Sequence, residues 1–402
     1  MNTEPPRNSS VAERQPRDKK RLLFLVTEYY YFRSHKIAVA DTAAQAGFEV
    51  VVAARPDNGS PTPENFEMKG LNWRRSGSLL GAAFQFLPEL LRVRRLLRDV
   101  KPDVLHNIAL KPAIIGSLAA MGSNIKVVNS INGFGFVFHD QSILAIIAQK
   151  ICGLILRISV RTNDARIVLQ NKDDEIFVRS HLNLPERHVS LIAGSGVDTA
   201  EFSIQPEPAE GPFKFLILAR LLYIKGIQIA IDAHSSLRSQ GHTSELVICG
   251  GHDAGNPSSI PAGMIAQWDK IPGVTFKGQL ADVRPLIAQC HVVLHPALGG
   301  EGLPKALLEA AASGRAMIAS DVRGNREVVI PNKTGLLVPP GRPEALAEAM
   351  GWIMNHPDAR KEWAEAARAK VITEFALTII LEQHLALYRE FAPDNFSRPT
   401  YS

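Results

Sequence analysis

The sequence predicts an α/β protein built from two doubly wound parallel sheets, and three observations support this prediction. Short apolar runs that read as strands alternate with segments of helical periodicity along most of the chain. This alternation occurs twice, before and after the proline-rich segment IQPEPAEGP at 204–212, which we interpret as a linker. The chain has 402 residues, 46% of them apolar, which is enough for two domains with separate cores.

The first domain is predicted to span residues 21–203. Its strands are expected at 21–26, 48–54, 103–108, 126–131 and 166–170, and its helices near 34–45, 79–98 and 142–160. The helix at 79–98 is amphipathic, because its apolar and arginine side chains fall on different sides. Residues 1–20 are polar and rich in Arg and Pro, so we expect a disordered tail and no signal peptide.

The second domain is predicted to span residues 213–375. Its strands are expected at 213–220, 244–251, 273–278, 291–297, 316–321 and 335–339, and its helices near 226–240, 282–290, 304–313 and within 343–390. Residues 376–402 are expected to form a helix and tail that pack back onto the first domain.

Charge and cysteine content narrow the class of protein. The net charge is +5, with the excess of Lys and Arg in the first half, which suits an anionic partner such as a diphosphate or an anionic membrane. No zinc-finger or RNP-type motif is present, so nucleic acid is not expected. The scattered Cys152, Cys249 and Cys290 indicate buried thiols in a reducing compartment, with no metal site. The sequence has no charge-free run of 18 apolar residues, so we expect no membrane span.

The most informative segment reads GGEGLPKALLEAAASG. Glu301 lies in its glycine-rich turn, and Glu309 lies on the helix that the turn opens. Gly300 and Gly302 allow the backbone to approach a ligand, and Pro304 suits the first helical position. The free N–H groups of the helix start favour an anion. Carboxylates beside an anion site indicate a ligand with both phosphate and hydroxyl groups, as in a nucleotide sugar.

A second motif, ARLLYIKG, places Arg220 at the end of a strand and Lys225 five residues later. In open α/β sheets ligands bind at the carboxyl ends of strands. Two cations there can neutralise a diphosphate and stabilise it as a leaving group, because its charge grows as the bond to the sugar breaks. From these residues alone, surface charge on a strand-to-helix loop is the alternative interpretation.

Together these segments resemble the nucleotide-binding part of glycosyltransferase family four. Its members are retaining enzymes with the GT-B architecture, in which two Rossmann-like domains face each other across a cleft. The stretch HPALGGEGLPKALLEAAASGRAMIASDVRGNREVV, followed by NKTGLLVPP, carries the family's two glutamates separated by seven residues. The resemblance implies that Glu309 accepts hydrogen bonds from the ribose and that Glu301 contacts the transferred sugar. It also implies that Arg220 and Lys225 hold the diphosphate, so Glu301, Arg220 and Lys225 form the expected catalytic set.

The same resemblance implies that backbone groups complete the donor site. These positions are Gly250, Gly251, Gly300, Gly302, Leu303 and Pro304.

The first domain departs from the family pattern in two places. After the first strand, TEYYYFRSH stands where many members have a glycine-rich loop. After the fourth predicted strand, Asn132 and Gly133 stand where many members have a histidine near the transferred sugar. This form is similar to a subgroup that acts on polyprenyl-diphosphate-linked sugars in bacterial surface polysaccharide and glycoprotein pathways. By that resemblance His106, Lys111, Asn132 and Gly133 are acceptor-side candidates, although a lone histidine at a strand end is often structural.

We therefore expect a retaining, metal-independent glycosyltransferase. It would move a hexose or N-acetylhexosamine from a nucleotide diphosphate sugar, with UDP favoured, to a polyprenyl-diphosphate-linked sugar, and it needs no cofactor besides the donor substrate. Front-face attack is favoured over double displacement, because no first-domain carboxylate stands out as a nucleophile. A cytoplasmic location on the inner face of the membrane is expected, with the helices at 79–98 and 142–160 as docking candidates. A catalytically silent GT-B module that assists assembly at the membrane is the alternative. A nicotinamide dehydrogenase is excluded, because no Gly-x-Gly-x-x-Gly follows the first strand.

Overall fold

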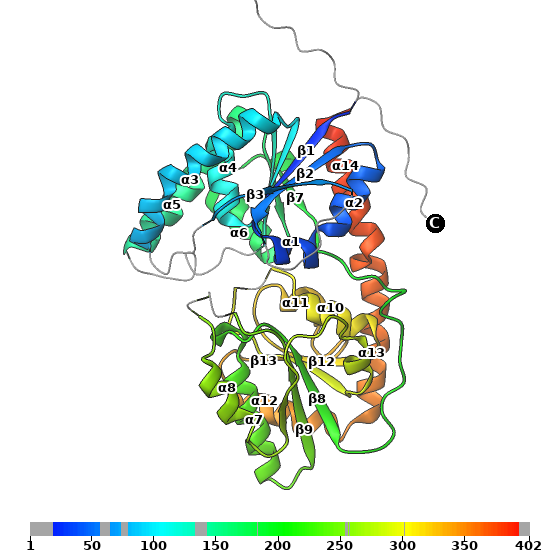
Figure 1. Ribbon diagram of the computed structural model, residues 1–402. Coiled ribbons are helices and arrows are strands. Elements are labelled where there is room, and N and C mark those ends of the chain that lie inside the picture. The colour runs from blue at the N-terminus through cyan, green and yellow to red at the C-terminus, as the bar shows by residue number, and fades with distance from the viewer. Residues whose placement is uncertain are drawn as a thin grey trace, which may run out of the picture.

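The computed structural model describes residues 19–56, 65–73, 79–132, 143–182, 184–253, 256, 258–300 and 302–393. Two parallel α/β sheets define two domains, which lie one above the other in Figure 1. Only Lys19 and Lys20 of the predicted tail fall within the described residues, and Gly133 and Glu301 lie outside them.

The first sheet has seven strands in the order β3-β2-β1-β4-β5-β6-β7. Their bounds are β1 Arg21–Glu28, β2 Glu49–Arg55, β3 Glu67–Gly70, β4 Val104–Ile108, β5 Lys126–Ile131, β6 Arg166–Leu169 and β7 Val189–Leu191. Helices cover both faces, so the inner strands are continuous apolar runs: the side chains from Leu22 to Val26 are all buried. The edge strand β3 escaped prediction because its sequence, EMKG, has neither apolar alternation nor β-branched residues.

Helices connect the strands of the first domain, and the first of them begins directly after β1. Their bounds are α1 Tyr29–His35, α2 Ile37–Gln45, α3 Leu79–Val100, α4 Leu110–Ala120, α5 Ile143–Asn163 and α6 Lys172–Leu182. The sequence did not predict α4, because the helix packs between the sheet, α3 and α5 and is buried on nearly every side. Such a helix has no polar face and therefore no amphipathic period.

The second sheet has six strands in the order β10-β9-β8-β11-β12-β13. Their bounds are β8 Phe213–Leu218, β9 Ser244–Cys249, β10 Val274–Phe276, β11 Val292–His295, β12 Ala316–Ser320 and β13 Leu336–Val338. The helices are α7 Ile227–Ser239, α8 Ala262–Trp268, α9 Arg284–Ala288, α10 Lys305–Ala312, α11 Asn325–Val328, α12 Pro343–Met354 and α13 Pro357–Lys370. A 3₁₀ turn, η3 Tyr223–Lys225, follows β8.

The chain crosses between the domains twice. The predicted linker has no regular secondary structure, and the buried Arg315 holds it by donating to the carbonyls of Gln205 and Pro206, at 2.7 and 2.9 Å. A π-helical turn, η4 Val371–Phe375, leads into α14 Leu377–Phe391, which lies beside α2 of the first domain in Figure 1. Tyr388 and Leu385 of α14 are buried in the same core as the inner face of β1.

Candidate active site

The two sheets present their carboxyl ends to each other. Asn171, which follows β6, donates a hydrogen bond to the carbonyl of Gly302, in the loop between β11 and α10, at 3.0 Å. We call residues 298–304 the donor loop. Ligands of open α/β sheets bind at the loops after the carboxyl ends of the strands, so we expect the site at the boundary between the domains.

Arg220 lies at this boundary, just after β8. Its Nη1 donates to the Tyr30 hydroxyl of α1 at 3.2 Å and lies 3.4 Å from the carboxylate of Asp253. The Arg220 side chain is 46% exposed, so it is accessible to a ligand. The segment that stands in place of a glycine-rich loop after β1 thus brings Tyr30 into contact with Arg220, the residue expected to bind the diphosphate.

Lys225 ends the turn η3 and is half-buried. The turn is fixed to the donor loop, because the N–H of Leu298 donates to the carbonyl of Ile224 at 2.8 Å. Arg220 and Lys225 follow β8, and the donor loop follows the neighbouring strand β11, so all three lie at the carboxyl ends of the second sheet.

Glu309 lies on α10 and is only 8% exposed. Burial raises the pKa of Glu309, and the ammonium group of Lys305, 3.4 Å away, opposes this increase. Lys305 also donates to the carbonyl of Ser34 in the first domain, at 3.3 Å. A buried carboxylate with one cationic neighbour can accept hydrogen bonds from the hydroxyl groups of a sugar.

His35 of α1 lies among the same cations. Burial, together with the positive charges of Lys305, Lys36 and Arg220, lowers the pKa of His35 to about 3. The imidazole is therefore neutral at physiological pH and adds no positive charge to the boundary. Its ring stacks on Tyr31, with ring centroids 4.2 Å apart.

The donor loop makes contacts that the sequence did not predict. The N–H of Leu303 donates to the Oε1 of Gln170 at 3.1 Å, so in this arrangement it does not face a ligand. A Cβ at Gly302 would lie 2.2 Å from the same Gln170 oxygen. Because Gly302 has no side chain, the first domain can approach the donor loop here. The sequence predicted that a ligand would approach at this position. Pro304 is the N-cap residue of α10, one position before the first helical position that the sequence predicted for it, and Gly300 has a φ of +75°.

Gly250 and Gly251 follow β9. A Cβ at Gly250 would lie 1.7 Å from the carbonyl oxygen of Ala219, so the chain's own backbone requires glycine at that position. The N–H of Gly250 donates to Gly278, and the carbonyl of Gly251 accepts from Leu221. Backbone packing therefore explains Gly250 without a nucleotide, whereas a Cβ at Gly251 would meet the side chain of Gln279, at 2.7 Å.

His106 is not placed to contact an acceptor, contrary to our expectation. It is fully buried in β4, with Nδ1 2.6 Å from the Tyr388 hydroxyl and Nε2 2.7 Å from Oγ of Ser130. Burial lowers the pKa of His106 well below its usual range, and Lys36 adds to this effect. The neutral ring therefore fastens α14 to the first sheet.

The other acceptor-side candidates lie at the carboxyl ends of the first sheet. Lys111 forms an ion pair of 2.8 Å with the buried Glu89 and lies over the Trp73 ring. Asn132 donates to the Tyr31 hydroxyl at 2.6 Å and accepts from Gln170 at 2.7 Å. Both side chains remain partly exposed.

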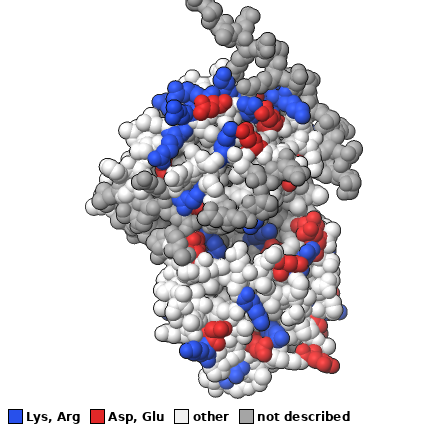
Figure 2. Space-filling view, viewed as in Figure 1, with Lys and Arg blue, Asp and Glu red and all other residues white. Residues whose placement is uncertain are grey.

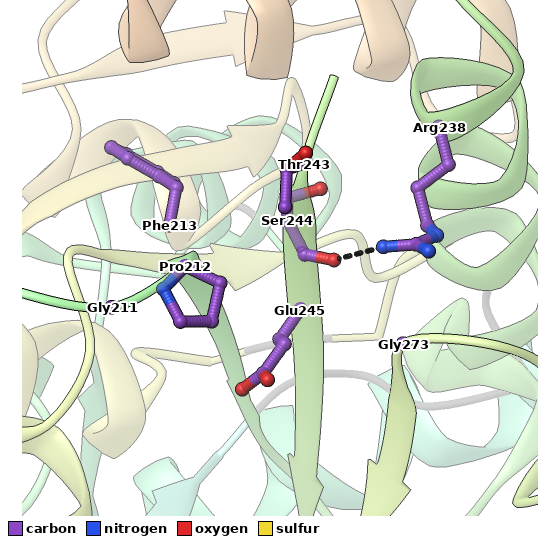
Figure 3. A pocket seen from close by; sticks show the side chains of 8 residues that line it. All are labelled: Gly211, Pro212, Phe213, Arg238, Thr243, Ser244, Glu245 and Gly273. Carbon is purple, nitrogen blue, oxygen red and sulfur yellow. Dashed lines mark hydrogen bonds between the residues drawn. The ribbon is translucent and has the colours of Figure 1, made fainter. Parts of the chain in front are cut away.

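Metal-ligand side chains, thiols and a surface hollow are the other candidate features within the described part of the chain. No group of three or more His, Cys, Asp or Glu side chains there is arranged to hold a metal ion, and the three cysteines are free thiols. A hollow of about 630 Å³ lies at the amino ends of β8 and β9, remote from the donor loop. Arg238 donates to the carbonyl of Ser244 in its wall, at 2.8 Å (Figure 3).

Family models and solved structures are similar to the chain over most of its length. Residues 198–370 match the family model "Glycosyl transferases group 1", and residues 21–170 match "Glycosyl transferase 4-like". Sucrose-phosphate synthase from Thermosynechococcus elongatus superposes with a TM-score of 0.75 at 20% identity, covering 94% of this chain and all of that one. Anabaena Alr3699/HepE, solved in complex with UDP, gives a TM-score of 0.71 at 16% identity, covering 92% and 100%.

A curated relative is also similar along most of its length. The N,N'-diacetylbacillosaminyl-diphospho-undecaprenol alpha-1,3-N-acetylgalactosaminyltransferase of Campylobacter jejuni is 24% identical over 318 residues, which is 76% of this chain and 81% of that protein. Fold, site and family models together define a glycosyltransferase with the GT-B fold. The chain belongs to the group 1 glycosyltransferases of family four, which are retaining enzymes that use a nucleotide sugar.

Proposed function

We propose that the chain transfers a hexose or N-acetylhexosamine from a UDP-sugar to a sugar carried on a polyprenyl diphosphate. The observation that carries this proposal is that Arg220 at the domain boundary, the Lys225 turn bonded to the donor loop, and the buried Glu309 on the helix after that loop all follow strands of the second sheet. The name of the Campylobacter relative supports the class of acceptor, and the UDP bound to the Anabaena neighbour supports the class of donor.

In this proposal the donor diphosphate lies between Arg220 and Lys225, and its ribose hydroxyls donate to Glu309. Glu301 contacts hydroxyls of the transferred sugar. As the bond between the anomeric carbon and the phosphate oxygen breaks, that oxygen gains negative charge, which the two cations stabilise. The same oxygen accepts the proton of the attacking acceptor hydroxyl on the front face, so configuration is retained without a metal ion.

Exposed apolar side chains on two helices of the first domain support a lipid-linked acceptor. Exposed apolar side chains on α3 recur at helical spacing, with Phe84 87%, Leu87 60% and Leu91 55% exposed. On α5 a similar exposed stripe includes Ile143, at 78%, and Leu154, at 56%. Eight of the 18 exposed large apolar side chains of the described residues lie on these two helices: Phe84, Leu87, Leu91, Ile143, Ile146, Ile147, Ile151 and Leu154.

Each stripe is followed by exposed cations in the later half of its helix. They are Arg92, Arg94, Arg95 and Arg98 on α3, and Arg157 and Arg161 on α5. Figure 1 shows α3 and α5 at the same side of the first domain, and Figure 2 shows Lys and Arg gathered over the upper part of that domain. An apolar stripe flanked by cations suits an anionic leaflet. No helix among the described residues is long and apolar enough to span a bilayer.

A transfer assay tests the proposed function. The chain is incubated with each of several UDP-sugars and a short polyprenyl diphosphate that carries one sugar, and the glycolipid product is analysed by mass spectrometry. Transfer from at least one UDP-sugar, with the anomeric configuration retained, is expected. If calorimetry detects no UDP binding and no donor is consumed, the proposal is wrong and the silent-module alternative gains support.

A further inference from the structure

One peptide group of the donor loop is held at both ends by two consecutive residues of the first domain. The N–H of Leu303 donates to Oε1 of Gln170 at 3.1 Å, and the carbonyl of Gly302 accepts from Nδ2 of Asn171 at 3.0 Å. These N–H and carbonyl groups belong to the same peptide unit. Its plane is therefore fixed from across the domain boundary, one residue after Glu301.

The Gln170 carboxamide is itself held in one orientation. A backbone N–H can only donate, so Gln170 must present its oxygen to Leu303. Its nitrogen then donates to Oδ1 of Asn132 at 2.7 Å, and the nitrogen of Asn132 donates to the Tyr31 hydroxyl at 2.6 Å. This chain of bonds connects the ends of β5 and β6 to α1 and leaves Gln170 only 7% exposed.

The fit around the held peptide is close. A Cβ at Gly302 would meet Gln170 at 2.2 Å and the Asn132 carbonyl oxygen at 2.9 Å, so a larger residue would prevent this approach. A Cβ at Gly194 would lie 3.0 Å from the Leu303 side chain, so glycine on the first domain also makes room for Leu303. Both partners thus lack a side chain where the domains meet.

A second set of polar contacts lies beside the first. At the start of α6 the N–H of Lys172 donates to Glu327 at 2.7 Å, and Asp173 pairs with Arg326 at 3.2 Å. Asp174, which also accepts from Asn171, pairs with Arg323 at 3.3 Å. These contacts hold the segment after β6 against the second domain. They involve α11 and the residue Arg323 before it, and they do not involve the donor loop.

We propose that Gln170 is a positioning residue, which orients the donor loop for transfer when the two domains are closed. Gln170 acts on the reaction through the Gly302–Leu303 peptide and does not bind the nucleotide. A neutral hydrogen bond of modest net strength suits this role, because it can break and re-form each time the cleft opens. The inference rests on the proposed function for its kinetic test, but its structural test does not.

Three variants test this inference. Gln170→Leu keeps the approximate volume and removes both hydrogen bonds. Gln170→Glu keeps an oxygen for the Leu303 N–H, and the Asn132 carboxamide can rotate to donate to the new carboxylate. Gln228→Leu is the matched control, because Gln228 is exposed on α7 and bonds only Asp232 one turn away in the described structure.

The first measurement is amide hydrogen exchange over peptides that cover residues 298–308 in the full chain. Gln170→Leu is expected to speed exchange there, whereas Gln170→Glu and Gln228→Leu remain close to the original chain. Unchanged exchange in Gln170→Leu would overturn the inference, whatever the chain transfers.

The second measurement separates positioning from binding. Gln170→Leu is expected to lower kcat about 10- to 100-fold, as a misplaced reacting group does, while calorimetry gives an unchanged Kd for UDP. Gln170→Glu should recover most of kcat. Equal losses in UDP affinity and in kcat/KM would show that Gln170 holds the nucleotide, and would also overturn the inference. Absence of transfer by the original chain, with the exchange result as expected, would reject only the proposed function.

Discussion

Lys305 and Glu309 lie one turn apart on α10, with Nζ 3.4 Å from Oε1, and the same ammonium group reaches the carbonyl of Ser34 in the first domain. The carboxylate expected to bind the donor is therefore part of the boundary between the domains. Ser34 lies on α1, which also carries Tyr30, the partner of Arg220. A nucleotide bound to Glu309 would therefore lie next to Lys305, which contacts α1. In the proposed function, the donor and the contact between the domains would share these side chains.

The cations of the donor site can be tested by removal. Arg220→Ala and Lys225→Ala should each lower kcat about 100- to 1,000-fold, because each removes a group that stabilises the charge on the leaving phosphate. Steady-state kinetics with a saturating acceptor measure this effect. Arg284→Ala is the control, since Arg284 is 44% exposed, close to the 46% of Arg220, and pairs with Asp282 on the surface. Normal kcat in both site variants would reject the assignment.

Glu309 should limit stability while it supports activity. Its folded pKa is raised, mainly by burial, so the folded chain binds the proton more readily than the unfolded chain does. The ionised carboxylate therefore destabilises the fold above its folded pKa. Glu309→Gln should increase the free energy of unfolding near neutral pH, and this gain should disappear below about pH 4.5, the ordinary value, where both states are protonated.

The same variant should weaken the use of the donor. Loss of charged hydrogen bonds to the ribose is expected to raise the KM for the donor about 10- to 100-fold. Urea unfolding at several pH values and donor titrations provide the two measurements. A Glu309→Gln chain that is less stable near neutral pH, yet equally active, would contradict this description of the site.

The Tyr388 hydroxyl should matter for stability and not for transfer. Tyr388→Phe leaves Nδ1 of the buried His106 without that partner, which should cost about 1–3 kcal/mol of unfolding free energy. Transfer rates below the melting temperature should remain unchanged, because His106 is a structural residue. A large loss of kcat with normal stability would instead restore the acceptor-side role that the sequence suggested.

The surface on α3 and α5 should bind anionic vesicles. Replacing Phe84 and Leu87 with Ser, or Ile143 and Ile147 with Ser, should lower co-sedimentation with vesicles that contain phosphatidylglycerol, because each pair removes apolar area from the contact. The control is Ile372→Ser, which changes a side chain 45% exposed near α14. Equal sedimentation of all variants would remove the membrane contact from the proposal.

The second domain was predicted from sequence better than the first, for a physical reason. Arg220 and Lys225 lie five residues apart, and Gly300, Pro304 and Glu309 lie within ten, so short motifs carry most of the donor side. Their local spacing on a turn and a helix fixes how they are presented. The fold class followed from the same local periodicity, repeated strand by strand.

The contacts between the domains could not be predicted in this way. Gln170 meets Leu303 across 133 residues of sequence, and His106 meets Tyr388 across 282. Nothing local to His106 shows that α14 will cover it, so a histidine at a strand end looked accessible. The one available signal for Gln170 and Asn171 was their place as polar residues directly after an apolar strand, which is where a parallel sheet positions its functional side chains.

The most direct measurement of the central claim is a crystal structure of the chain with UDP. The claim predicts the diphosphate between Arg220 and Lys225 and the ribose hydroxyls on the carboxylate of Glu309. UDP bound at another place, or with its diphosphate away from both cations, would contradict it.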